Sequence, residues 1–197
     1  GRFTVYSSRS TWYIRRDCMS LVDIKKLNLF PVEALRIVTD LDNEAITQYT
    51  LEHRKKWDRY TTYHDRKLNE DWQNGLPDKE KLDKAIIDAG HEFVKVTNRK
   101  PFEEPPFMYY WVSVYEEGDQ HGSHNHPNSL IAGTYYPSVA IDSASIILES
   151  PWKNHIMHDN ISGWTYNYKP QPGDMLVWPS WLDHRVPVQE KSNTKRV

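Results

Sequence analysis

The second half of the chain alternates short apolar and aromatic runs with turn-forming residues. Five such runs, rich in β-branched and aromatic side chains, occupy residues 107–115, 130–136, 144–148, 163–168 and 175–178. Turn-formers such as Pro127-Asn128 and Pro172-Gly173-Asp174 separate them. Short strands at these intervals are typical of an antiparallel sandwich or barrel. We therefore predict a mainly β core over residues 101–197.

The first hundred residues have a helical pattern instead. One helix is predicted to start at Asp42-Asn43, and another after Pro77-Asp78, with Leu82, Ile86 and Phe93 on one face. Residues 69–76 are polar and contain glycine, which favours a mobile connection. The expected organisation is a mostly helical region, residues 1–100, packed on the β core as a single compact unit.

Charge and cysteine content exclude several classes of protein. Residues 1–100 carry a net charge of +3 and residues 101–197 one of −5, without the concentrated basic stripe that nucleic-acid binding needs. No apolar run approaches the ~20 residues of a membrane span. With Cys18 as the single cysteine, no intramolecular disulfide forms, and a reducing, cytoplasmic location is expected. The chain starts without Met and without a signal-like region, which suggests trimming.

Three of the nine histidines have the spacing of a metal site. His124 and His126 are two residues apart at an expected strand, so their side chains project to the same face. His184 follows a turn, an apolar strand and a second turn, which would return it to that pair. Together they predict a facial set of three ligands with open positions for substrate. The histidines of the helical half receive no role.

Two separated blocks of residues resemble a known family. The first reads Tyr115-Glu116-Glu117-Gly118, then His124-Asn125-His126, then Gly133-Thr134-Tyr135-Tyr136. The second reads Pro172-Gly173-Asp174, an apolar strand, Pro179-Ser180, His184, and Arg196 twelve residues further on. Over residues 107–197 the chain resembles Fe(II)/2-oxoglutarate-dependent oxygenases of the prolyl-4-hydroxylase-like kind, and is most similar to a subgroup from bacterial and phage genomes.

The resemblance implies a fold and an activity. The fold would be a double-stranded β-helix, a jelly-roll barrel with iron inside one mouth. The activity would be hydroxylation of a peptidyl or small-molecule C–H bond, with release of succinate and CO2. The cofactors would be Fe(II) and 2-oxoglutarate, with ascorbate as a reductant. The identity of the substrate and the oligomeric state do not follow from the sequence.

The resemblance also assigns roles to individual residues. His124 and His184 would be iron ligands, and His126 takes the family's carboxylate position. Arg196 would pair with the distal carboxylate of 2-oxoglutarate, for which a guanidinium fork is well shaped. Tyr135 would donate a hydrogen bond to the same carboxylate, and Tyr115 would contact the other end of the cosubstrate.

The chain departs from the family pattern in two places. Where most relatives carry Asp, this chain has His126. It either ligates the iron, leaves a vacant position, or is replaced by a nearby acidic residue or water; we favour ligation. The chain also ends at Val197, directly after Arg196, so the expected final strand is barely begun. This predicts either a shortened chain or a barrel that is incomplete there.

Two other functions compete with the oxygenase. A cupin-type three-histidine metalloenzyme without 2-oxoglutarate fits Gly118 and the His124-Asn125-His126 run, but the glutamate expected shortly afterwards is replaced by Leu130 and Ile131. A non-enzymatic jelly-roll module would use a surface of tryptophans: Trp152, Trp164, Trp178 and Trp181. The second hypothesis leaves the histidines unexplained.

Overall fold

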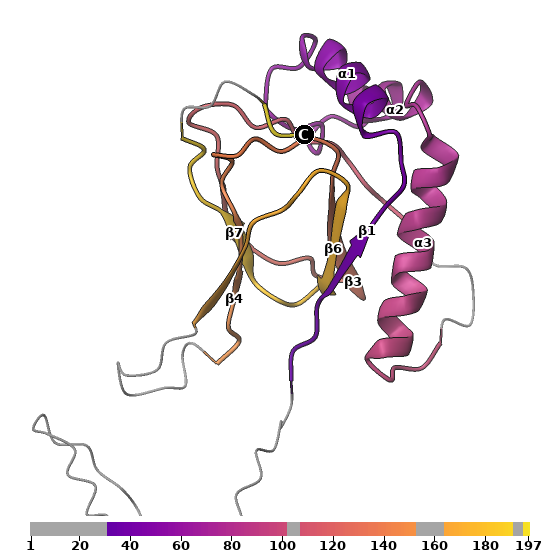
Figure 1. Cartoon of the computed structure of the whole chain (residues 1–197), viewed down its shortest axis with the longest axis vertical. Helices are drawn as coiled ribbons and strands as arrows, with labels where there is room; N and C mark the ends of the chain where they lie inside the picture. Colours follow the sequence, from indigo (N-terminus) through magenta and orange to yellow (C-terminus); the bar gives the residue numbers. More distant parts are fainter. Residues whose placement is uncertain (1–30, 102–106, 153–163, 191–194) are drawn as a thin grey trace, which may run out of the picture. The chain divides into compact units, whose positions relative to one another are not determined.

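The computed structural model describes residues 31–101, 107–152, 164–190 and 195–197 (Figure 1). Apart from Pro31, these residues belong to a unit spanning Val32–Val197. Cys18 and residues 1–30 of the predicted helical region lie outside these ranges. The described helices are α1 (Asn43–Arg54), α2 (Arg66–Asn74) and α3 (Lys79–Val96). The described strands are β1 (Leu35–Val38), β2 (His121–His124), β3 (Ile131–Tyr136), β4 (Ile146–Glu149), β5 (Thr165–Tyr168), β6 (Asp174–Pro179) and β7 (His184–Val186).

Two helices start where the sequence predicts them. The Asp42 side chain accepts a hydrogen bond from the Ala45 amide at 3.0 Å, which satisfies one of the free amides at the start of α1. α3 follows Asp78 and buries Leu82 and Phe93 on one face. Within the described ranges, no helix combines the length and apolarity needed to cross a membrane.

The predicted connection at residues 69–76 is wrong, because α2 fills most of it. Asp65 caps this helix by accepting a hydrogen bond from the Leu68 amide at 2.9 Å. Asn69 and Trp72 are its buried residues, and the Trp72 indole N–H donates to the Thr50 hydroxyl at 3.1 Å. Because the helix has few apolar residues, a hydropathy pattern does not indicate it. The Asp65 cap and the buried Trp72 stabilise it.

The strands form two antiparallel sheets, which confirms the prediction of a mainly β second half. One sheet has the order β1-β6-β3 and the other the order β2-β7-β4-β5. In the first, Tyr136 lies opposite Asp174 and Ala132 opposite Trp178. In the second, His124 lies opposite His184. The result is a mainly β architecture compatible with a β-sandwich, with helices packed against one sheet (Figure 1).

Two strand predictions need correction. β1, from the half expected to be helical, pairs with β6 at the edge of the first sheet. Conversely, residues 107–115 form no regular strand; the described part makes isolated bridges at Ser113 and Tyr115. The segment nevertheless runs beside residues 60–62, since the Val114 amide donates to the Tyr60 carbonyl at 2.7 Å.

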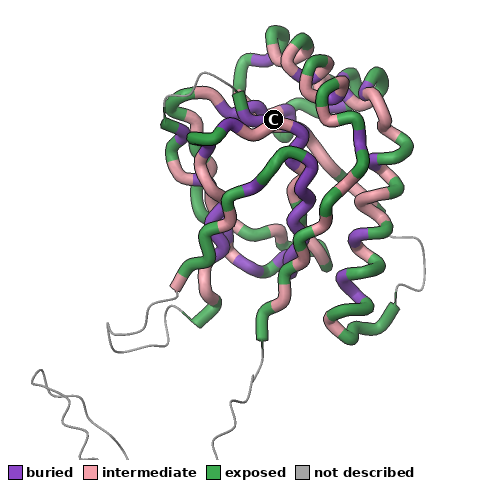
Figure 2. The backbone as a smooth tube through the Cα atoms, viewed as in Figure 1, coloured by how far each residue is buried: buried purple, intermediate pink, exposed green. Residues whose placement is uncertain are grey.

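The two faces of β6 are buried against different partners, since successive strand side chains point to opposite sides. Met175 and Val177 pack with the helices, in a cluster that includes Ile46, Trp72, Leu82, Phe93 and Val114. Leu176 and Trp178 pack between the sheets, in a cluster that includes Tyr136, Ile146, Leu148 and Leu182. All six residues of β6 are buried, and Figure 2 shows buried residues gathered along this strand.

Candidate metal centre

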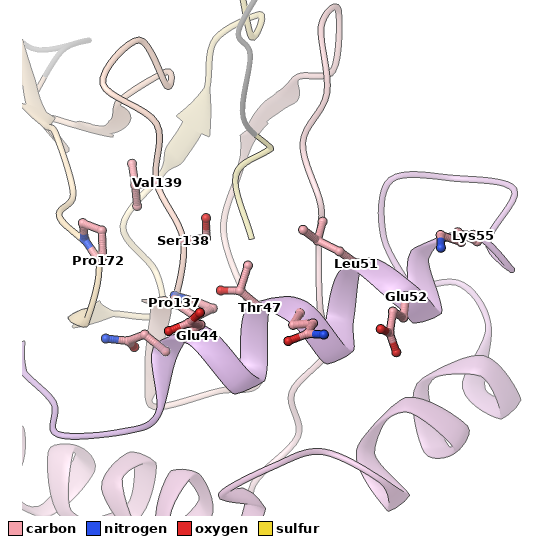
Figure 3. A pocket seen from close by; sticks show the side chains of 11 residues that line it. Glu44, Thr47, Leu51, Glu52, Lys55, Pro137, Ser138, Val139 and Pro172 are labelled. Carbon is pink, nitrogen blue, oxygen red and sulfur yellow. The ribbon is translucent and has the colours of Figure 1, made fainter.

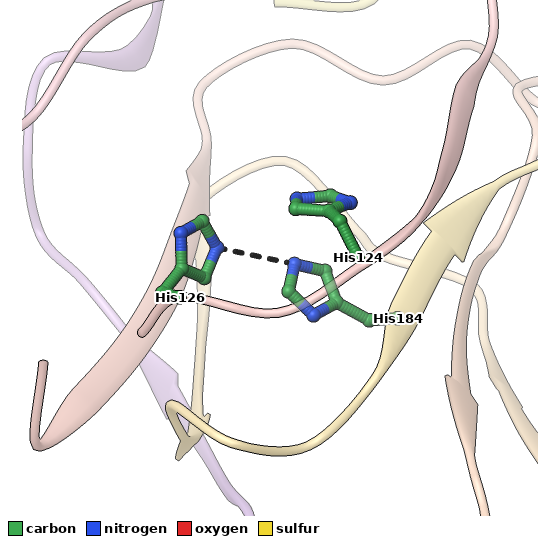
Figure 4. Close-up of side chains that lie close together, drawn as sticks. All are labelled: His124, His126 and His184. Atoms are coloured by element: carbon green, nitrogen blue, oxygen red, sulfur yellow. Dashed lines mark hydrogen bonds between the residues drawn. The ribbon is translucent and has the colours of Figure 1, made fainter. Parts of the chain in front are cut away.

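Strand pairing brings the three predicted histidines together. His124 ends β2 and lies directly opposite His184, the first residue of β7. His126 lies two residues beyond β2, where its backbone amide donates to the Ser180 carbonyl at 2.9 Å. Figure 4 shows the three rings converging from these segments. The chain thus places side chains 58 and 60 residues apart in sequence around one point.

The ring nitrogens have the geometry of a metal-binding set. One nitrogen from each histidine can be chosen so that all three lie within 4.8 Å of one another. The Nε2 atoms of His126 and His184 are 3.3 Å apart, as the dashed line in Figure 4 indicates. A metal ion at the centre would replace this contact, because ligand atoms bound to one ion at ~2.1 Å each lie about this far apart.

Backbone carbonyls fix the orientation of two of these rings. Nδ1 of His124 lies 2.8 Å from the Gly122 carbonyl, and Nδ1 of His184 lies 3.0 Å from the Leu182 carbonyl. Because a carbonyl oxygen only accepts, each Nδ1 must carry the proton. The Nε2 lone pairs are then free for a metal, and this outer hydrogen bond is the usual support of a ligating histidine.

Burial favours the neutral form of two of the three rings. It lowers the pKa of His184 to about 4, with a further lowering by the neighbouring histidines and an opposing effect of the Leu182 carbonyl. Burial also lowers the pKa of His126, and His124 adds to that effect. Neutral imidazoles are the form that binds metal ions. Within the described ranges the cluster contains no carboxylate, so the candidate ligand set consists of three imidazole nitrogens.

A fourth histidine flanks the centre. The His121 ring stacks on His124 with a centroid distance of 4.1 Å and an interplanar angle of 14°. Its other ring neighbour is Tyr60, at 6.2 Å. Burial lowers the pKa of His121 to about 4. The sequence placed His121 in the histidine-rich run without a role; the structure makes it a support for a ligand ring.

Arg196 lies in a second polar position, buried between aromatic rings. Its guanidinium carbon is 5.0 Å from the ring centroids of both Tyr115 and Tyr136. One guanidinium nitrogen donates to the Ala144 carbonyl at 2.6 Å. Among the described residues, no carboxylate lies within ion-pair distance of this side chain. A buried guanidinium thus keeps several donors for an anion.

The structure brings Tyr115 to Arg196 but not Tyr135. The Tyr115 amide donates to the Arg196 carbonyl at 2.8 Å, so backbone pairing holds the two residues together. Tyr135 points to the helical side of its sheet, where its hydroxyl donates to the Asn43 side chain. The expected role of Tyr135 beside Arg196 therefore does not fit its position.

Tyr136 takes the place that the sequence assigned to Tyr135. It is 1% exposed, its ring faces Arg196, and burial raises the pKa of its hydroxyl. That hydroxyl has no partner in hydrogen-bonding geometry in the described part of the chain, but Arg196 and Thr134 lie close enough to lower its pKa against the effect of burial. The alternation of side chains along β3 could have identified Tyr136 as the inward-facing tyrosine. Tyr136 shares a face with Ala132 and Thr134, which lie opposite Trp178 and Leu176, respectively.

Asp174 and Trp178 are buried and support the fold. Asp174 is buried and forms an ion pair with Arg36 at 2.7 Å, tying β1 to β6. Of the four tryptophans proposed as a binding surface, Trp178 is 1% exposed, with its ring 4.8 Å from His184. A residue so buried does not line an open stacking surface. Its indole N–H has no partner among the described residues.

A separate cavity lies beside α1. It has a volume of about 580 Å³ and is bordered by α1 and the loop at residues 137–139 (Figure 3). Glu44, Glu52 and Lys55 line it, but none of the three histidines does. It therefore has no part in the candidate metal centre.

Comparison with known proteins agrees with this site. Residues 109–197 match the family model described as "Putative 2OG-Fe(II) oxygenase". The matched segment includes all three histidines, Tyr115, Tyr136 and Arg196. No curated protein shows significant similarity to the chain.

Proposed function

We propose, from the match of residues 109–197 to the 2OG-Fe(II) oxygenase family model, that the chain is an Fe(II)- and 2-oxoglutarate-dependent dioxygenase of that superfamily. We propose that it hydroxylates a C–H bond of a peptide or small molecule, with release of succinate and CO2. The observation that carries this proposal is the convergence of His124, His126 and His184 on one point inside the matched segment.

The ligand set fits Fe(II). Imidazole nitrogens bind iron well, and three of them on one side leave positions for further ligands. We propose that His126 ligates in place of the carboxylate usual in the family, because its Nε2 lies 3.3 Å from that of His184. A set of three neutral ligands leaves the full positive charge on the ion, which strengthens its attraction for an anionic cosubstrate.

The surroundings of Arg196 favour 2-oxoglutarate over a cupin-type site that takes no keto acid. The guanidinium lacks a carboxylate partner within the described ranges, and the buried Tyr136 hydroxyl beside it lacks a hydrogen bond. A distal carboxylate would satisfy both groups at once. Tyr115 covers the guanidinium from the other side. The three-histidine alternative leaves these groups unexplained.

When bound, iron and 2-oxoglutarate supply the oxidation, in which the keto acid loses CO2 and one oxygen atom of O2 enters the substrate. The chain's own residues bind and orient. The histidines hold the ion, Arg196 and Tyr136 hold the distal carboxylate, and the apolar cluster between the sheets excludes water. We further propose that the two sheets represent the double-stranded β-helix of the superfamily.

The test is an anaerobic titration of metal-stripped protein with Fe(II), followed by 2-oxoglutarate. Chelation of the keto acid to Fe(II) is expected to produce a visible charge-transfer band. His126→Ala should weaken or shift the band if His126 is a ligand, and leave it unchanged if it is not. Iron binding without a band would favour the cupin-type function, and absence of iron binding would refute the metal centre.

A further inference from the structure

An aromatic row leads from the molecular surface to the candidate metal centre. It consists of Phe107, Tyr109, Trp111 and Tyr115, which are odd-numbered residues of one extended segment. The even-numbered residues between them, Tyr110, Val112 and Val114, pack with the helices. Because extended side chains alternate, Trp111 and Tyr115 share the opposite face, with Ser113 between them. Phe107 and Tyr109 continue the row outward, where they border a hollow beside α2.

The exposure of the row falls toward the interior. Phe107 is 93% exposed and Tyr109 51%, Trp111 is half-buried, and Tyr115 is 7% exposed. At the inner end Tyr115 contacts Arg196, and in the middle the Trp111 ring lies 5.9 Å from that of His126. The inner end thus belongs to the proposed cosubstrate position. The outer part is exposed and is joined through the Tyr109–Trp111 ring contact to the residue that lies beside His126.

The outer part of the row is widened by a further ring. The ring centroid of Tyr63, which is 50% exposed, lies 4.8 Å from that of Trp111. The ring centroid of Tyr109 lies 5.8 Å from that of Trp111. The three rings are tilted against one another, by 57° and 41°, and do not stack closely, so ring area remains available to a ligand. Exposed aromatic patches of this kind on soluble proteins commonly mark binding sites.

The local charge indicates what kind of group would bind. Arg66 interacts electrostatically with Tyr109, and its neighbour Glu70 is held in an ion pair with it at 2.7 Å. Lys79, which borders the same hollow as Phe107 and Tyr109, forms an ion pair with Asp83, and the His64 ring contacts Tyr63. These groups provide no excess of negative charge that would favour a cation on the ring faces. Flat neutral groups gain most from such a surface, through burial and offset ring packing.

We propose that the aromatic row and Tyr63 form the substrate wall of the enzyme, and that the substrate presents a neutral aromatic or other flat apolar group to it. This inference rests on the proposed function, because the adjacent metal centre is what makes a ligand here a substrate. The half-buried Trp111 would bring that group next to His126, and Tyr63 and Tyr109 would flank it.

The test compares two small probes on protein loaded with Zn(II) and 2-oxoglutarate, which does not turn over. The probes are N-acetyl-L-phenylalaninamide and N-acetyl-L-lysinamide, and binding is followed by saturation-transfer NMR titration. The phenylalanine probe is expected to bind at least about tenfold more tightly. Tyr63→Ala and Tyr109→Ala should each weaken it about two- to tenfold, the range of one aromatic contact. Both side chains are half-exposed, so folding should survive.

The matched control is Tyr166→Ala, which removes a tyrosine that is 64% exposed on β5. It should leave probe binding unchanged. Equal binding of the two probes, failure of the phenylalanine probe to bind, or an equal loss in Tyr166→Ala would overturn the proposal. The Fe(II)/2-oxoglutarate band reports separately on the proposed function. If the band appears but Tyr63→Ala and Tyr109→Ala do not weaken binding of the phenylalanine probe, the substrate wall is refuted and the proposed function is not. If the probe binds but no band appears, the oxygenase function is refuted.

Discussion

The two faces of the β3–β6 strand pair are formed by adjacent residues, but they differ in whether their buried polar atoms have hydrogen-bond partners. On the face toward the helices, the Tyr135 hydroxyl donates to Asn43 and the surrounding side chains are apolar. On the face toward the second sheet, the Tyr136 hydroxyl and the Trp178 indole N–H are buried without partners in the described part of the chain. Arg196 adds a buried guanidinium without a carboxylate there.

This difference separates the part of the molecule that maintains the fold from the part that binds a ligand. A buried polar group without a partner costs about 1–3 kcal/mol, so a face built only for stability would avoid it. The inward face accepts that cost at two groups, the Tyr136 hydroxyl and the Trp178 indole N–H, and places the Arg196 guanidinium next to the Tyr136 ring. A ligand that supplies a carboxylate and a metal ion would recover it, which is why the contrast supports a binding site.

The largest effect that we expect to distinguish the two faces is a loss of folding stability at low pH. The pKa of His184 falls from 6.5 to about 4 on folding, so between these values the unfolded chain binds the additional proton. The metal-free protein should therefore be fully stabilised above pH 6.5 and lose about 3 kcal/mol from His184 alone as the pH falls to 4. Urea unfolding at several pH values measures this slope.

His184→Gln should reduce that slope by the share of one histidine, while His121 and His126, whose pKa values burial also lowers, maintain the rest. His91→Gln, at an exposed position of α3, controls for the general effect of a histidine-to-glutamine change on stability. Saturating Zn(II) should also shift the loss of stability to lower pH, because protons and metal compete for the same nitrogens. Equal slopes in wild type and His184→Gln would contradict the buried, neutral state of this ring.

The next effect sharpens the contrast at Arg196. Arg196→Lys keeps the charge but removes the planar fork, so 2-oxoglutarate should bind about 10- to 100-fold more weakly, as expected for a lost hydrogen bond to a charged group. Isothermal titration with Zn(II)-loaded protein measures the change. The control is Arg36→Lys, because Arg36 forms an ion pair with Asp174 at the fold-maintaining β1 edge. It should lower stability and leave 2-oxoglutarate affinity unchanged; the reverse pattern would exclude Arg196 from the site.

The sequence predicted the clustering of the three histidines better than their surroundings. The spacing of His124 and His126 and the turn–strand–turn before His184 were sufficient, because strand geometry is regular and a metal site needs only three side chains. α2 was not predicted, since its stability comes from Trp72 contacting Thr50 across the fold rather than from its own apolar pattern. β1 depends likewise on a distant partner, β6.

The error at Tyr135 has a different physical cause. Two neighbouring tyrosines at the end of β3 look equivalent in sequence, and which one faces inward is decided by the register with β6. A shift of one residue would exchange them. The register becomes visible only once Tyr136 is placed opposite Asp174 and Ala132 opposite Trp178.

The smallest expected effect tests the contrast between the faces most directly, because it uses these two neighbours. Tyr136→Phe removes a hydroxyl that has no partner in the described chain, so stability should stay the same or rise, while 2-oxoglutarate binds about tenfold more weakly. Tyr135→Phe removes the hydrogen bond to Asn43, so stability should fall by about 1 kcal/mol with no change in affinity. Urea unfolding and calorimetric titration of both variants measure the four values. If Tyr135→Phe weakens 2-oxoglutarate binding and Tyr136→Phe only alters stability, the assignment of the two faces is reversed, and the cosubstrate site must lie on the helical side of the sheet.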